Sequence, residues 1–227
     1  MLTPYDWQEA IGHRISYVQS RLAGGAPVLA VSLEEGVLAL TVRRQARKIY
    51  EVYDRLLFAG LGQQSDIESL RVAAIDFAHQ EGYQRSEPDV TIQRVISALS
   101  TPMKRSFGDF NSSPFVVRSL FAEVGAERSE DKFYLLDFDG DYSIRQGYAV
   151  LAGGQEVSGP DRERLQALST GKANISEAQK ELESIWANAM DTENGKSFAE
   201  LTKDLTPEVA LLSRDPQAQS RFRLLSS

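Results

Sequence analysis

The feature that most constrains this fold is an amphipathic helix placed directly before a series of short apolar segments. Between Thr3 and Ala23, apolar side chains recur at spacings of three or four, which is typical of a helix with one buried face. Thr3 is a candidate cap, Pro4 suits the first helical position, and Gly24-Gly25 can end the helix. The expected buried stripe consists of Trp7, Ile11, Ile15, Val18 and Leu22.

The rest of the chain alternates groups of strands with pairs of helices. Asp139-Gly140 predicts a hairpin turn, and Pro102 predicts a kink or boundary in its helix. Because strands and helices come in groups, the sequence predicts two stacked sheets with helices on both outer faces. We expect strands at 27–33, 37–42, 48–53 and 56–60, helices at 63–81 and from 89, strands at 114–125, 132–138 and 142–152, helices from 160 and at 176–191, and closing strands at 208–213 and 221–225.

Composition narrows the class of function. The 227 residues include 32 acidic and 25 basic side chains, and the net charge of −7 opposes non-specific nucleic-acid binding. No apolar run approaches the roughly 20 residues that span a bilayer, and the start of the chain lacks a signal-peptide pattern. The absence of cysteine excludes disulfides and cysteine-bound metals. We therefore expect a cytoplasmic protein that binds neither membrane nor nucleic acid.

Several segments, taken in order, resemble α-type subunits of the proteasome core particle, most closely the bacterial form. The resemblance covers nearly the whole chain. It implies an α+β fold, a four-layer αββα sandwich of the N-terminal-nucleophile hydrolase type, as a single domain over 1–227 with the front helix at 1–24 and the sandwich at 25–227. The segments are Thr3-Pro4, Gly36 to Ala39, Lys48 to Asp54, Phe58 to Gly62, Ser69 to Arg71, Ala78 to Tyr83, Phe121 to Val124, Ala152 to Gly154 and Glu208 to Leu212.

The resemblance also implies a role in protein degradation. Subunits of this kind form seven-membered outer rings stacked on catalytic β rings, and they are not themselves catalytic. They build the antechamber, form the axial gate and dock ring ATPases in pockets between neighbours. The implied partners are therefore other α-type subunits, proteasome β-type subunits and a ring ATPase activator, and no cofactor is implied.

The residues at the head of the first strand agree with a non-catalytic role. A threonine peptidase needs its nucleophile at the chain terminus, because the free α-amine activates the hydroxyl. Here the first strand starts near Ala26-Pro27, where the nitrogen is an amide, and Val42-Arg43-Arg44 offers no carboxylate where catalytic relatives place an acid. We predict no catalytic residue. The alternatives are a divergent self-processing threonine peptidase of the same fold and a free-standing ring that scaffolds another activity.

Two candidate sites follow from the resemblance. A pocket lysine is expected upstream of Lys48, but the connection is shorter here and lacks one, so Arg43 or Arg44 is expected to hold the carboxylate of the activator. Gly62 and Gln63 are expected to supply backbone groups to the same pocket, although Gly62 also suits a plain strand-to-helix turn.

The second candidate site is the gate. Related subunits carry a longer extension that fills the pore, whereas Met1 and Leu2 alone precede Thr3 in this sequence. We therefore expect a pore that this subunit barely occludes.

A third pattern, Asp137-Asp139-Asp141, imitates the start of a calcium loop, but the position of Gly140 favours a hairpin turn, and we expect no metal site.

Overall fold

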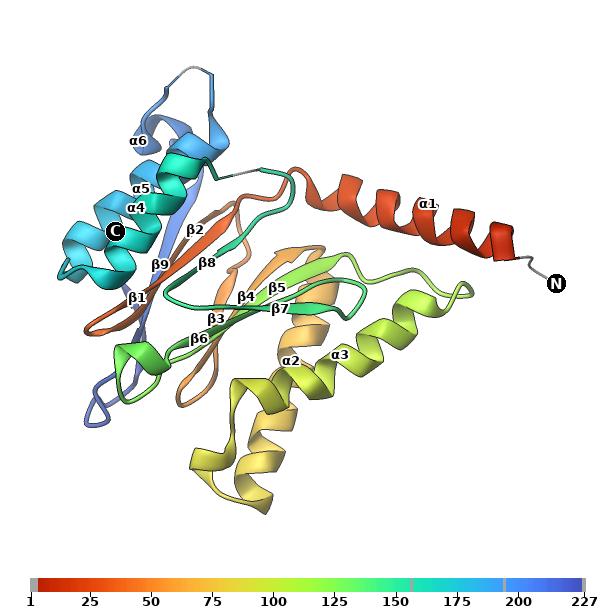
Figure 1. Ribbon diagram of the computed structural model, residues 1–227, viewed down its shortest axis with the longest axis horizontal. Helices are drawn as coiled ribbons and strands as arrows, with labels where there is room; N and C mark the ends of the chain where they lie inside the picture. Colours follow the sequence, from red (N-terminus) through yellow and green to blue (C-terminus); the bar gives the residue numbers. More distant parts are fainter. Residues whose placement is uncertain (1–3, 156, 194, 226–227) are drawn as a thin grey trace.

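The computed structural model describes residues 4–155, 157–193 and 195–225. The predicted α+β sandwich is confirmed: two five-stranded sheets face each other, and helices cover both outer faces (Figure 1). The elements are α1 (Pro4–Leu22), β1 (Val28–Leu33), β2 (Gly36–Arg43), β3 (Ile49–Tyr53), β4 (Leu56–Gly62), α2 (Gln64–Gln84), α3 (Ile92–Gly108), β5 (Val117–Glu123), β6 (Lys132–Leu136), β7 (Tyr142–Arg145), β8 (Tyr148–Leu151), α4 (Gly159–Thr170), α5 (Ile175–Met190), α6 (Phe198–Leu201), β9 (Thr206–Ser213) and β10 (Phe222–Leu225).

The sheets are antiparallel, and each has its own strand order. The first sheet runs β10-β9-β2-β1-β8 and carries α4 and α5 on its outer face. The second runs β3-β4-β5-β6-β7 and carries α2 and α3. A third apolar cluster fills the space between the sheets. Strands β1 and β4 are therefore buried on both faces, which explains why they read as continuous apolar runs and not as alternating ones.

One sequence expectation is wrong in a way that matters for the edge of the sandwich. Residues 142–152 were expected as one strand, but β7 and β8 are separate strands in different sheets. The break falls at Gly147, whose φ of +77° is open to glycine and strained for residues with a Cβ. A side chain there would also lie 2.7 Å from the hydroxyl of Ser169. The chain thus leaves one sheet and enters the other through this glycine.

The helices also differ from expectation at three points. Of the kink or boundary expected at Pro102, the boundary is wrong, since α3 continues through Pro102 to Gly108, and the kink stays a prediction. The segment from Glu87 to Asp89 is a separate 3-10 turn, and α3 begins after it, at Ile92. The short helix α6 was not predicted, because four residues are too few to show a periodic pattern.

Helix α1 lies across one end of the strands and projects beyond the sandwich (Figure 1). Its expected buried stripe is confirmed toward its C-terminal end, where Val18 and Leu22 are fully buried. Trp7, in the projecting half, is 44% exposed and packs edge-on against Phe110. The proposed cap Thr3 lies outside the described residues.

Candidate functional site: the head of strand β1

Three side chains from distant parts of the sequence converge on the peptide that joins α1 to β1. The Lys48 ammonium donates to the carbonyl of Ala26 at 3.0 Å. The carbonyl of Pro27 accepts from the Thr41 hydroxyl at 2.8 Å and from the Trp186 indole at 3.0 Å. These contacts come from β2, from the start of β3 and from α5. The head of β1 is therefore fixed in place from three sides.

This arrangement decides what chemistry the head of β1 can perform. The nitrogen of Pro27 is a tertiary amide, so it has neither a proton nor a basic lone pair. The buried hydroxyl of Thr41 donates to a carbonyl, which leaves its oxygen without a base that would activate it. The geometry at this point is that of a structural junction between a helix and a strand.

The same junction adjoins a cluster of positive charges organised by one buried acid. Both carboxylate oxygens of Glu208 accept backbone N–H groups, from Lys48 and Ile49, at 3.0 Å each. The Nε atoms of Arg43 and Arg47 lie 3.6 and 3.8 Å from the same carboxylate. Glu208 on β9 thus ties the end of β2 to the start of β3, which belong to different sheets.

Burial changes the acidity of Lys48 in this cluster. Loss of solvent lowers the pKa of its ammonium from 10.5 to about 8, and the nearby carboxylate of Glu208 offsets part of that shift. The sequence grouped Lys48 with the neighbouring arginines as a charge run. It gave no sign of the role of Glu208, because that residue lies about 160 positions away and its partners become visible only when the sheets stack.

The structure places the four predicted activator-pocket residues at this end of the sandwich, with different exposure. Arg44 is exposed and Arg43 is half-buried. Gly62 has a φ of +140°, and a Cβ there would lie 2.1 Å from the carbonyl of Val116, so the strand-to-helix turn requires glycine. The N–H of Gln63 donates to that carbonyl, and its own carbonyl accepts from α2. The backbone of Gln63 is therefore already used within the fold.

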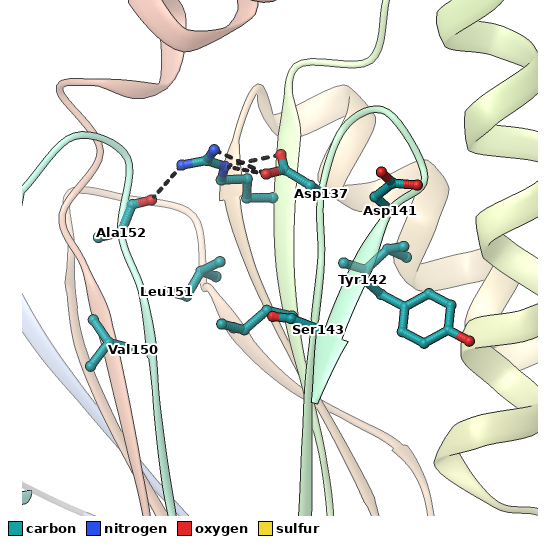
Figure 2. Close-up of a pocket in the computed structure, with 10 residues that line it drawn as sticks. Asp137, Asp141, Tyr142, Ser143, Val150, Leu151 and Ala152 are labelled. Atoms are coloured by element: carbon teal, nitrogen blue, oxygen red, sulfur yellow. Dashed lines mark hydrogen bonds and ion pairs between the residues drawn. The ribbon is translucent and has the colours of Figure 1, made fainter. Parts of the chain in front are cut away.

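The remaining expectations fall elsewhere on the molecule. Met1 and Leu2, the expected gate residues, lie outside the described residues. Asp137 pairs with Arg118, whose guanidinium also donates to the carbonyl of Ala152 (Figure 2). In the described part of the chain, no three acidic, histidine or cysteine side chains gather as a metal site would require.

None of the described helices is long and apolar enough to cross a bilayer.

The fold and the blocked strand head define the class: a four-layer sandwich of the N-terminal-nucleophile hydrolase type with a helix joined to its first strand. A family model described as "Proteasome subunit" matches residues 25–159, and the chain belongs to that family, as an α-type subunit.

Individual relatives support the α type. Proteasome subunit alpha of Kineococcus radiotolerans is 29% identical over 100% of this chain and 95% of its own length. Proteasome subunit alpha of Jonesia denitrificans is 31% identical over 66% of this chain, and that of Nocardioides sp. is 28% identical over the same share. These two alignments span 64% and 60% of the relatives' own lengths.

Proposed function

We propose that this chain is a non-catalytic α-type subunit of a proteasome core particle, which forms the outer ring, gates substrate entry and docks a ring ATPase activator. The non-catalytic role is supported chiefly by the structure at the head of β1. Its nitrogen is an internal tertiary amide, and three side chains hold its carbonyls. A nucleophile that depends on a free α-amine has no place in this geometry.

The docking role is supported by the charge of the β2–β3 connection. Arg43, Arg44, Arg47 and Lys48 carry four positive charges, and the carboxylate of Glu208 offsets one of them, in a chain whose net charge is −7. Such a local surplus favours an anionic partner, and a guanidinium holds a carboxylate with two parallel hydrogen bonds. Because the backbone of Gln63 is bonded internally, we assign carboxylate capture to Arg44 and Arg43, with Gly62 and Gln63 shaping the wall beside them.

The gating role is assigned to the projecting half of α1 and to the residues that precede it. Met1 and Leu2, which precede α1 in the sequence, are the proposed gate residues. Lys48 connects the two sites, because it belongs to the charged cluster and also holds Ala26 at the base of α1.

Reconstitution with a proteasome β-type subunit tests the catalytic assignment. We expect the α chain alone to hydrolyse no fluorogenic peptide, and the mixed particle to hydrolyse peptide even without an activator. Hydrolysis by the α chain alone would favour the alternative, a self-processing threonine peptidase. Strong repression in the mixed particle, relieved by an activator, would contradict the open pore.

The docking assignment is tested by substitution. We expect Arg44→Ala to weaken capture of a ring ATPase about tenfold, because one charge-assisted contact is lost, while the ring stays assembled. Arg105→Ala, which removes an exposed arginine from the last turn of α3, is the matched control and should leave capture unchanged. Equal capture by both variants would contradict this pocket.

A further inference from the structure

The two edges of the sandwich differ in shape. On one side the terminal strands of the two sheets are β8 and β7, and on the other side they are β10 and β3. The helices pack on the outer faces of the sheets, and within the described residues these four strands pair with a neighbour on one side alone. A ring built from identical subunits needs two different lateral faces on each copy, because its contacts run head to tail. The two edges indeed present different groups at the gap between the sheets.

The β7–β8 edge is hollow. A cavity of about 290 Å³ opens between the two strands, with Leu135, Val150 and Leu151 among its apolar lining residues and Ser143 on its wall (Figure 2). A second cavity, of about 610 Å³, adjoins it along β8 and includes Arg145. The first cavity also has Arg118 and the two carboxylates of Asp137 and Asp141 in its lining. The charged residues that line the second cavity, Arg118, Arg145 and Arg162, are all positive. The hollow therefore combines apolar walls with positive charge along β8.

Strand register shows that the side chains of this edge face the gap. Ser143 pairs with Leu135 and Arg145 with Phe133, and directly paired residues of an antiparallel sheet point to the same face. Phe133 and Leu135 both belong to the cluster between the sheets. Among the described residues, Arg145 has no carboxylate partner, and its guanidinium donates to the carbonyl of Ile144.

The β3–β10 edge carries the complementary features. Leu224 pairs with Ala210 and Glu51 with Leu57, and both partners belong to the cluster between the sheets, so Leu224 and Glu51 also face the gap. Leu224 is 46% exposed, which is high for a leucine on a strand. Glu51 has no cationic partner within the described part of the chain.

We propose that consecutive copies of this chain pack edge to edge, with Leu224 of one copy in the hollow of the next and Glu51 of the first copy facing Arg145 of the second. The proposal rests on the ring assembly that belongs to the proposed function. The partner is a second copy of this chain, and two distinct surfaces meet. An apolar side chain enters a cavity with apolar walls, while a carboxylate meets a guanidinium that has no carboxylate partner among the described residues.

Because the chain contains no cysteine, paired cysteines report this contact without background. In Ser143→Cys/Leu224→Cys, oxidation or a short bismaleimide linker should join copies into a covalent ladder that ends at the size of the ring. Each single variant should stay uncoupled, since like edges do not meet. The control Ser143→Cys/Tyr83→Cys places the second thiol at the exposed Tyr83 position of α2, in the outer helix layer and not at the gap between the sheets, and should form no ladder.

Charge reversal tests the polar part of the contact. Arg145→Glu should lower the fraction of chain in rings about tenfold at fixed concentration, and adding Glu51→Arg to the same chain should restore it. Rings that give no ladder with the Ser143/Leu224 pair would overturn the edge assignment alone. Coupling in the Ser143→Cys single variant would overturn it in favour of like edges meeting. A cysteine-free parent that forms no ring would contradict both this inference and the proposed function.

Discussion

The two halves of helix α1 differ in how far they are buried against the sandwich. The C-terminal half ends on the body of the protein, where Val18 and Leu22 are fully buried and Ala26-Pro27 is held by Lys48, Thr41 and Trp186. The N-terminal half projects from the sandwich (Figure 1) and carries the exposed Trp7. The difference shows that α1 has a fixed base and a free end.

The middle and the projecting end of α1 are held by a smaller set of contacts than its base. Arg14 is buried and donates to the carbonyl of Ser106 at the end of α3, and its guanidinium lies over the rings of Phe107 and Phe110. Trp7 adds one aromatic contact, with Phe110. The sequence Gly24-Gly25 resembles a hinge, yet the carbonyl of Leu22 approaches Gly153 so closely that a Cβ there would lie 1.9 Å away. Movement of α1 is therefore expected at its projecting half and not at the glycine pair.

The largest expected effect is at the fixed base. Trp186→Ala should lower the free energy of unfolding by about 3–5 kcal/mol, because the indole is 1% exposed and its loss leaves a cavity and a carbonyl with one donor fewer. Trp7→Ala, at the free end, should cost about 1 kcal/mol. Urea denaturation of the two variants measures the contrast. Similar losses for both would contradict the description of a fixed base and a free end.

The next largest effect is the dependence of stability on pH that Lys48 introduces. The ordinary pKa of lysine, 10.5, applies to the unfolded chain, whereas burial lowers the folded value of Lys48 to about 8. Between these pH values the unfolded chain binds more protons, so stability should rise with pH, and below pH 8 Lys48 adds no pH dependence.

Lys48→Met isolates this contribution from other groups that titrate in the same range. The difference in unfolding free energy between the wild type and this variant should shift in favour of the wild type as pH rises from 8 to 10.5, by roughly 3 kcal/mol at most. Parallel pH profiles for the two proteins would show that Lys48 is not buried as described.

Glu208→Gln should lower stability by about 1–3 kcal/mol, because an amide has one acceptor oxygen for the two N–H groups that the carboxylate now accepts. Chemical denaturation measures the loss. Glu163→Gln, at an exposed position of α4, is the matched control and should change stability little. An unchanged midpoint for Glu208→Gln would contradict its role as the link between β2 and β3.

The smallest effect should appear at the free end. Arg14→Met keeps much of the apolar packing of the side chain but removes its donor, so global stability should fall by about 1 kcal/mol. Hydrogen exchange should quicken in the projecting half of α1, and exchange in β1 should stay unchanged. Faster exchange in β1 as well would mean that the two halves of α1 are one cooperative unit.

Local patterns were sufficient to predict most of the fold. The C-terminal part of the α1 stripe, the apolar strands β1 and β4 and the Asp139-Gly140 turn appear where they were expected, whereas Trp7 of the expected stripe is 44% exposed. The break between β7 and β8 was missed because Gly147 lies in a stretch with the composition of a continuous strand, and only the packing of α4 against it reveals the change of sheet.

The candidate site was less predictable than the fold. Arg43, Arg44 and Lys48 stand out as a charge run, but Glu208, which contacts Arg43 and Lys48, lies 160 residues after Lys48 in the sequence. Trp186, which holds the carbonyl of Pro27, lies 159 residues after Pro27. Long-range pairs of this kind leave no periodic signal, because each residue follows the pattern of its own element. The predicted backbone role of Gln63 depended on hydrogen bonds that no local pattern encodes, and those bonds prove to be internal.

The most direct test of the central claim is the intact mass, with the N-terminal sequence, of the chain recovered from a particle assembled with β-type subunits. We expect α1 to remain joined to β1, so that no species begins at the head of the sandwich. A mature chain that starts at a threonine within the sandwich, and that gains mass on treatment with an electrophilic peptide inhibitor, would contradict the account of a blocked strand head.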